Sequence, residues 1–238
     1  GRGYIYANTA NTTLSFTGDL VVEAVEQNIT ATTDNELKGF NLIGNPFTHN
    51  ITLDHISGAN LAAGFYTLTN EGAWNANSNN TGVIGACQGA LIKTTETEAK
   101  TVSINPAPAS KSRSENNGQL EINVSNANYN DVAYVTFNKG IGLDKIEHRN
   151  ANIPMVYVPV NGTNYAVAIM SQDVTEIPVS FVAKTMGEYT ISVEAQDCEF
   201  AQMYLIDKMT GYSTNLLLED YTFMAKSGDN AERIVIRL

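Results

Sequence analysis

The chain has 238 residues, and 25 Asp and Glu against 14 Lys and Arg give it a formal net charge of −11. A negative field of this size repels phosphate backbones and anionic lipid surfaces, so we expect no nucleic-acid partner. No apolar run approaches the roughly 18 residues of a membrane-spanning helix, so we also expect no membrane insertion. The length is sufficient for one large β domain or two small ones, each with a buried core.

The first half of the chain carries short apolar patterns of period two and no helical pattern of useful length. Residues 4–6 are strand-like, Leu14 and Phe16 alternate with polar residues, and residues 20–22 form another apolar run. In the stretch GFNLIGNPF, Pro46 lacks the backbone donor that a sheet requires, so a strand is expected to end there. Further strands are predicted at 51–53, 65–68, 83–84, 90–92 and 102–104.

The segment from 70 to 82, NEGAWNANSNNTG, is predicted to be a long polar loop that holds Trp74, the only tryptophan. With Tyr66 nearby in the sequence, the indole would stack on a sugar ring while the amides of Asn75 and Asn77 bond its hydroxyls. Alternatively, the indole folds back over the sheet, because a large apolar ring gains stability from burial. A carbohydrate site at these four residues is therefore one of two interpretations.

The composition changes at Asn105, where the stretch NPAPASKSRSENNG begins. It contains no apolar residue larger than alanine or proline, which is typical of an exposed linker. We therefore predict an N-terminal module at 1–105, a linker at 106–118 and a C-terminal module at 119–238.

The second half is expected to contain about ten short strands. Its clearest pattern is IPVSFVAKTMGEYTISVE at 177–194, which predicts an antiparallel hairpin with Phe181 and Tyr189 on its buried side and Ser180 on the opposite face. Asn-Gly at 161–162 favours a type I′ turn between two further strands. The remaining strands are predicted at 120–124, 132–137, 155–160, 165–170, 203–208, 211–218, 221–225 and 233–238. The predicted fold class is two consecutive antiparallel β-sandwich modules with jelly-roll or immunoglobulin-like packing.

Several longer stretches carry a family resemblance. They are GRGYIYAN, LSFTG and GFNLIGNPF in the first half, then GIGLDKIEH, IPMVYV, IPVSFVAKTMGEYTISVE, YLIDKMTG and LLLEDYTFMAKSGDNAERIVIRL in the second. Together they resemble the carboxy-terminal β-sandwich modules of large, adhesin-like Bacteroidetes surface and secreted proteins, which are commonly exported by the type IX route. The resemblance covers nearly the whole chain.

The resemblance implies a non-catalytic accessory region, structural or adhesion-type, in a larger bacterial cell-surface or secreted protein. Its expected partners are the neighbouring domains of the parent chain and a host or cell-surface protein or glycan. The strand-like opening and the ending at Leu238 predict that further sequence precedes and follows. The alternatives are a carbohydrate-binding module and a fragment of a secreted hydrolase.

One short segment has the composition of a calcium loop. Asn126, Asn128, Asn130 and Asp131 place side-chain oxygens close together in sequence, as some calcium sites do. Only Asp131 is charged, and a hard cation favours carboxylates, so the alternative is a turn that the asparagine side chains stabilise. No other cofactor is expected.

Residue types that carry catalytic chemistry are sparse. His49 and His55 would lie roughly 20 Å apart on one strand, too far to share a metal unless the strand breaks, and His148 is predicted to be solvated. Cys87 and Cys198 fall in different halves and are predicted to be small buried thiols. No Gly-x-Ser-x-Gly or His-Glu-x-x-His motif is present, so we expect no enzymatic activity.

Overall fold

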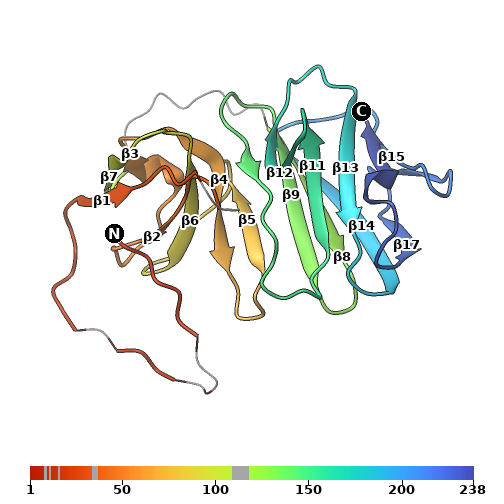
Figure 1. Cartoon of the computed structure of the whole chain (residues 1–238). Coiled ribbons are helices and arrows are strands. Elements are labelled where there is room, and N and C mark those ends of the chain that lie inside the picture. Colours follow the sequence, from red (N-terminus) through yellow and green to blue (C-terminus); the bar gives the residue numbers. More distant parts are fainter. Residues whose placement is uncertain (8–9, 11, 16, 34–36, 109–117) are drawn as a thin grey trace.

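The computed structural model describes residues 1–7, 10, 12–15, 17–33, 37–108 and 118–238. These ranges contain eighteen β-strands and two single-turn 3₁₀ helices, which confirms the predicted all-β class. The strands form a three-stranded, a four-stranded and an eleven-stranded sheet, which follow one another along the long axis of the molecule (Figure 1). Within these ranges no helix has the length and apolar character needed to cross a bilayer.

The first half of the chain builds the two small antiparallel sheets. Their orders are β1-β7-β3 and β2-β6-β4-β5. The strands are β1 (Val25–Ile29), β2 (Phe40–Gly44), β3 (Ile56–Ser57), β4 (Leu61–Leu68), β5 (Trp74–Ser78), β6 (Gly89–Thr94) and β7 (Lys100–Ile104), and the 3₁₀ helix η1 (Leu53–His55) precedes β3. An apolar cluster is shared by the two sheets: Ile29, Ile43, Phe47, Ile51, Leu53, Ile56, Phe65, Ile84, Ala90, Ile92, Val102 and Ile104.

The end of β2 follows the chemistry of GNPF. Asn45 is buried, and its Nδ2 donates to the carbonyls of His49, Ile84 and Gly85 at 2.8 to 3.1 Å. Its Oδ1 accepts the N–H of Phe47 at 3.0 Å. One asparagine side chain therefore satisfies the backbone groups that the strand leaves behind as it ends, which is how a buried turn avoids unpaired polar atoms.

The second half builds the eleven-stranded sheet, whose path runs β16-β15-β18-β13-β11-β12-β9-β8-β14-β17, with β10 paired to β12. It is mixed, because β9 and β12 run parallel while the other pairs are antiparallel. The strands are β8 (Gln119–Ser125), β9 (Asn130–Thr136), β10 (Leu143–Asp144), β11 (Met155–Val160), β12 (Thr163–Ile169), β13 (Glu176–Val182), β14 (Gly187–Gln196), β15 (Tyr204–Asp207), β16 (Ser213–Asn215), β17 (Tyr221–Ala225) and β18 (Ile234–Arg237), with the 3₁₀ helix η2 (Ala231–Arg233) before β18.

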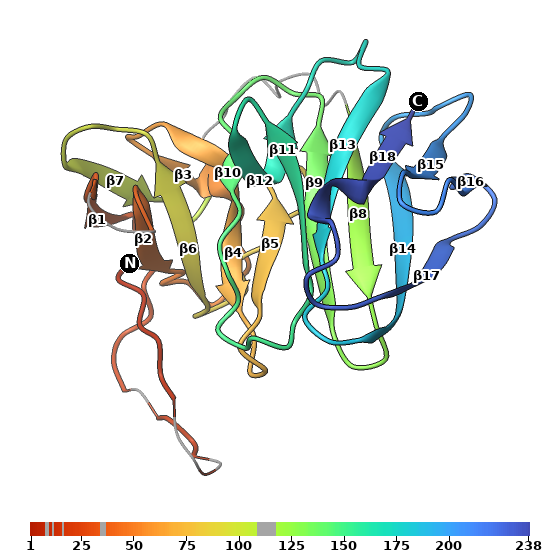
Figure 2. The ribbon, with the colours of Figure 1, turned by 45° about the vertical axis from the view of Figure 1, so that its right-hand side comes forward.

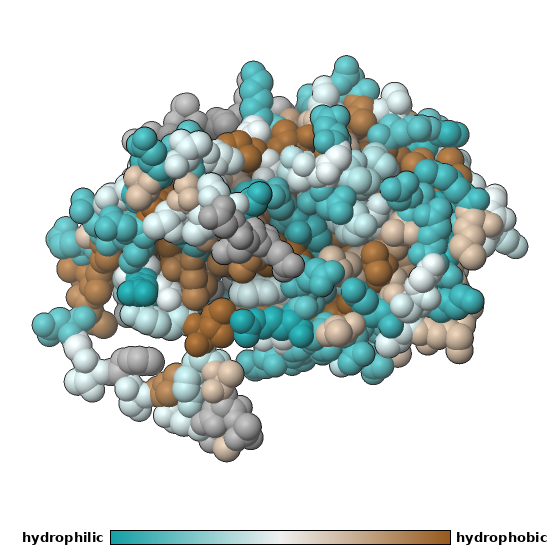
Figure 3. Space-filling model, in the orientation of Figure 1, coloured by the Kyte–Doolittle hydropathy of each residue, from teal (hydrophilic) through white to brown (hydrophobic). Residues whose placement is uncertain are grey.

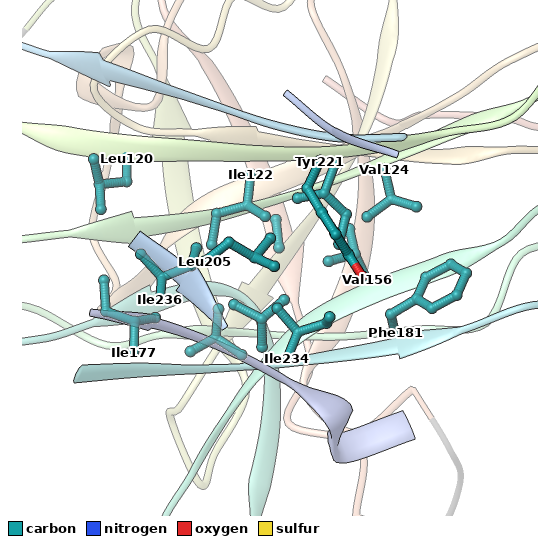
Figure 4. Packing of buried hydrophobic residues seen from close by; sticks show 14 of the residues in the cluster. Leu120, Ile122, Val124, Val156, Ile177, Phe181, Leu205, Tyr221, Ile234 and Ile236 are labelled. Carbon is teal, nitrogen blue, oxygen red and sulfur yellow. The ribbon is translucent and has the colours of Figure 1, made fainter. Parts of the chain in front are cut away.

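This long sheet curls almost into a closed cylinder around its own core. Side chains from strands far apart on the path, such as Leu120 and Ile236, belong to one buried cluster (Figure 4). The prediction of β strands in this half is therefore confirmed, but the strands belong to one continuous sheet.

The predicted hairpin at 177–194 is wrong as to pairing. β13 pairs with β11 and β18, whereas β14 pairs with β8 and β17. The connection between them is exposed at Met186, and the rings of Phe181 and Tyr189 meet edge to face in the core with centroids 4.9 Å apart. Alternation identified the buried faces of both strands but could not identify their neighbours, because period-two patterning says nothing of which edge a strand joins.

The exposure of the neighbouring Ser180 also differs from the prediction. Ser180 is buried, although Pro178 and Val182 on the same face of β13 are only half-buried. By contrast, the predicted hairpin at 161–162 is confirmed: Val160 pairs with Thr163, and Asn161 and Gly162 have φ of 50° and 80°, as a type I′ turn requires.

The N-terminal arm, residues 4–24, contains no strand among its described residues. Leu14, Leu20 and Val22 are exposed, and Phe16 lies outside the described residues. The strands predicted at 4–6 and 20–22 are therefore wrong: strand-like patterns form strands only where a partner edge pairs with them. Conversely, the loop predicted at 70–82 contains β5.

The two halves pack against each other through the second face of the four-stranded sheet (Figure 2). The buried cluster at this interface joins residues of both halves: Phe40, Ala62, Tyr66, Trp74, Ala76 and Leu91 from the first, and Tyr134, Leu143, Ile146, Ala166 and Val167 from the second. Backbone bonds also cross it, from Ala63 N–H to Ile141 O at 2.7 Å and from Arg149 N–H to Gly72 O at 2.9 Å.

Candidate functional site

A groove of about 650 Å³ lies between the N-terminal arm and the four-stranded sheet. Tyr4 and Tyr6 of the arm form one wall, and their side chains are 76% and 56% exposed. Leu42 of β2 and Leu68 of β4 line the opposite side. Figure 3 shows the arm standing off from the body at the lower left of this face. The size falls within the range of small-molecule sites in proteins.

The arm is anchored where it meets the sheet. Gly3 N–H donates to Leu42 O at 3.4 Å, Gly44 N–H donates to Gly1 O at 2.8 Å, and Arg2 forms an antiparallel bridge with Ile43. The first three residues thus extend the four-stranded sheet beyond β2. This attachment places the rings that follow at the mouth of the groove.

Tyr66 and Trp74 form the buried floor of the groove. Their rings contact edge to face at 6.5 Å, and Trp74 is only 7% exposed. The Tyr66 hydroxyl donates to Asp144 O at 2.7 Å and accepts the N–H of Ile146 at 3.3 Å. Burial, followed by the charge of Asp131, raises the pKa of Tyr66 well above its ordinary value. The structure brings these two predicted site residues together, with their rings committed to packing.

The two asparagines predicted beside Trp74 lie elsewhere. β5 alternates, so Trp74, Ala76 and Ser78 are buried while Asn75 is exposed on the other face. Asn77 is half-buried and donates from Nδ2 to Asn75 O at 2.9 Å. Because successive residues of a strand point to opposite faces, Asn75 and Asn77 cannot reach a ligand that touches Trp74.

A buried charged cluster lies beneath the interface between the halves. Asp131 on β9 pairs with the ammonium of Lys145, and its Oδ2 also accepts the N–H of Val156 at 2.7 Å. Nε2 of His148 lies 3.2 Å from Oδ1 of Asp131, an electrostatic contact that is not an aligned hydrogen bond. All three side chains of the cluster are almost fully buried. The prediction that His148 is solvated is therefore wrong.

The cluster is linked to the floor of the groove. Nδ1 of His148 accepts the backbone N–H of Trp74 at 3.0 Å, so this nitrogen carries no proton. Burial alone would raise the pKa of Asp131, but Lys145, and then His148, outweigh it and hold that pKa below its ordinary value. The carboxylate is thus ionised and fully engaged.

The four residues of the predicted calcium loop do not converge. Oδ1 of Asn126 accepts the N–H groups of Asn128 and Tyr129 at 2.9 and 2.8 Å, which is a turn held by an asparagine side chain. Asn130 is exposed, whereas Asp131 points into the buried cluster. Among the described residues, no three His, Cys, Asp or Glu side chains group closely enough to hold a metal.

The cysteines and remaining histidines are not assembled into a site. Cys87 and Cys198 are free thiols, and Cys87 is exposed, which corrects the prediction that both are buried. The predicted strand from His49 to His55 is interrupted by η1. This helix ends at His55, whose Nδ1 accepts the backbone N–H of Thr52 at 3.1 Å. His49 instead contacts Pro106 O through Nε2 at 2.9 Å.

A second buried ion pair lies in the C-terminal part of the chain. Nε of Arg233 donates to Oδ1 of Asp207 at 3.0 Å, and the Tyr221 hydroxyl donates to Oδ2 at 2.7 Å. The guanidinium also covers the ring of Phe223 at 4.8 Å. Burial would raise the pKa of Asp207, but the bonds from Arg233 and Tyr221 lower it to about 2.

The comparisons with known proteins find a match for part of the chain only. Residues 157–238, about a third of the sequence, match a family described as a domain of unknown function (DUF8693). No curated protein and no solved structure matches the chain significantly. The matched stretch contains the Asp207 pair but not the groove or the Asp131 cluster.

Sequence reasoning did not identify Tyr4, Tyr6 and Arg149 as lining residues of the groove, or Lys145 and His148 as partners of Asp131. The stretch GIGLDKIEHRN carries a signal for Lys145 only, which lies between Leu143 and Ile146, where a charge requires a partner, whereas the neighbours of His148 are polar. The position of the groove carried no comparable signal, because it depends on contacts between segments distant in the sequence.

Proposed function

We propose that this chain is a non-catalytic, structural or adhesion-type accessory region of a larger bacterial cell-surface or secreted protein. Its two halves are interpreted as consecutive β-sandwich modules fixed to each other. The observation that carries the proposal is the interface between the halves, which has a buried apolar cluster and is crossed by polar bonds. Such an interface favours a stiff spacer over two loosely tethered domains.

The polar bonds across the interface fix its register. Asp144 on β10 pairs with Lys93 on β6 and accepts the Tyr66 hydroxyl, while Ser78 donates to Gln119 at 2.5 Å. Hydrogen bonds at a largely desolvated interface are costly to break without replacement. Relative rotation of the halves would break several of them at once, so the halves are expected to move as one body.

Rigidity is tested by spin-label distance measurements on the whole chain. One label is placed on exposed Cys87 and the other on Met186→Cys, which is 79% exposed in the second half, with Cys198→Ser to prevent a third label. A rigid spacer gives a single narrow distance distribution. A broad distribution like that of flexibly linked domains would overturn the proposal of a stiff spacer.

The non-catalytic part of the proposal is tested by a screen over peptide, ester and glycoside substrates. No turnover above background is expected, since no nucleophile, base and orienting group meet in the predicted motifs. Turnover that a single substitution abolishes would refute this part.

A second candidate function is carbohydrate binding, and the groove is the observation that favours it. Exposed tyrosine rings offer flat apolar faces beside polar groups, which is the chemistry that sugar rings require. The test is a glycan array with the whole chain and with Tyr4→Ala/Tyr6→Ala. Binding that this double variant removes supports the candidate, and binding that survives it places any glycan site elsewhere.

A further inference from the structure

The charge of the groove differs from the charge of the protein. The chain carries 25 acidic and 14 basic residues, yet the described residues that line the groove include one charged side chain, Arg149, and no carboxylate. Among its described lining residues the groove therefore has one cationic side chain and no anionic one. Its chemistry favours a ligand with a negative group.

The backbone around Arg149 is held firmly. Its N–H donates to Gly72 O at 2.9 Å, and Gly72 has φ of 84° in the β4–β5 turn. A Cβ at position 72 would approach Arg149 Cβ to 3.4 Å and Asn150 N to 3.3 Å. The tight contact of these two segments therefore positions Arg149 at the rim of the groove.

The Arg149 side chain is available to a ligand. It is exposed, and no carboxylate in the described part of the chain pairs with it. A guanidinium presents two parallel N–H donors that match the two oxygens of a carboxylate. An arginine that is positioned by backbone bonds and has no ion-pair partner among the described residues meets the requirement for recognising such a group.

The rest of the lining fits a sugar. Tyr4 and Tyr6 are exposed on the arm, with the Arg2 guanidinium over the Tyr4 ring at 5.6 Å from its centre, and Thr69 and Gln88 add polar side chains. Oε1 of Gln88 accepts the N–H of Gly85 at 2.8 Å, which leaves its Nε2 to donate to a ligand hydroxyl.

An extended peptide fits less well. A peptide that adds to a sheet needs free backbone groups on an edge strand. At this side of the sheet the edge of β2 is already occupied, because Gly1 and Gly3 bond Gly44 and Leu42. The groove therefore offers side-chain chemistry in place of a strand-pairing edge.

From these observations we infer that the groove binds an oligosaccharide that carries a carboxylate, with Arg149 pairing to the carboxylate and the tyrosine rings stacking on the sugar. This inference rests on the carbohydrate-binding candidate above. The net charge of −11 opposes an anionic ligand at long range, but at physiological salt charges beyond about 8 Å are largely screened.

The test begins with a glycan array of uronate oligosaccharides, sialylated glycans and neutral oligosaccharides at physiological salt. The best acidic binder and its methyl ester, which has the same sugar without the charge, are then titrated by calorimetry. We expect the acid to bind and the ester to bind roughly 10- to 100-fold more weakly.

Arg149→Ala is expected to bind the acid more weakly than the parent chain by the same factor and to bind the ester with unchanged affinity. Arg237→Ala is the matched control, because Arg237 is also exposed but pairs with Glu176 in the second half. Equal melting temperatures of the Arg149→Ala variant and the parent chain show that the variant is folded.

Four outcomes contradict the inference. If only neutral glycans bind, or if the ester binds as well as the acid, the carboxylate assignment is wrong while carbohydrate binding stands. If no glycan of either kind binds, the carbohydrate candidate fails as well. If an acidic peptide binds through Arg149 and the glycans do not, the groove recognises a peptide and the assignment to sugars is wrong.

Discussion

Replacing Asp131 with asparagine tests whether the buried cluster is a principal element of stability. Asparagine keeps the shape of the side chain and an oxygen for Val156 N–H, but it removes the charge that Lys145 faces. Breaking a buried pair by removing one partner typically costs about 3–5 kcal/mol, because the other charge stays buried without compensation. Domains of ordinary stability have about 5–15 kcal/mol in total, so the loss is large.

The measurement is urea denaturation at neutral pH, followed by circular dichroism and by the fluorescence of Trp74. The backbone N–H of Trp74 donates to Nδ1 of His148 in the cluster. Glu176→Gln is the matched control, since that carboxylate pairs with Arg237 at 2.6 Å on the surface. Exposed pairs contribute about 0–1 kcal/mol. The double variant Asp131→Asn/Lys145→Met is expected to regain much of the loss, because it removes the unpaired ammonium. A loss for Asp131→Asn no larger than that of the control would refute the reasoning.

Three further predictions follow from particular contacts. Phe181→Ala is expected to lower the free energy of unfolding by about 3–5 kcal/mol, because the ring is buried against Tyr189 and Phe223 with centroids 4.9 and 5.3 Å apart. Met186 is exposed, so Met186→Ala is expected to change that free energy by less than about 0.5 kcal/mol. Similar small losses for both variants in urea melts would contradict this prediction. Asp207 has a pKa of about 2 against an ordinary 3.8, so its contribution is complete above pH 3.8 and lost as the pH falls toward 2. Urea melts should therefore show Asp207→Asn less stable than the parent chain by a constant amount above that pH and by a shrinking amount below it, and a gap that does not shrink would be evidence against this role. The sequence predicts that trypsin cuts first at Lys111 or Arg113, which lie outside the described residues. Because the interface between the halves is buried, the two fragments are expected to co-elute in gel filtration. Fragments that separate would show that the interface is weak.

The sequence determined the all-β class and most strand positions, because alternation of apolar and polar residues is a local property of each strand. It also located the turn at 161–162, where Asn-Gly adopts positive φ at little cost. It identified Phe181 and Tyr189 as buried for the same reason. These features need no knowledge of the rest of the chain.

Only the tertiary structure decided which strands pair. β13 and β14 are adjacent in sequence yet lie across the core from each other, and the strand-like arm segments at Leu14 and at residues 20–22 form no strand. Pairing depends on the competition of all edges for partners, which a local pattern does not record.

The candidate site was determined in the same way by contacts between distant segments. Tyr66 and Trp74 could be proposed from the sequence, but Arg149 joins them only because the 149–150 backbone bonds Gly72. His148 looked solvated in its polar stretch and is buried because Asp131 and Trp74 surround it. Burial and charge pairing are properties of the folded neighbourhood, since a side chain's environment is supplied mainly by residues far away in the sequence.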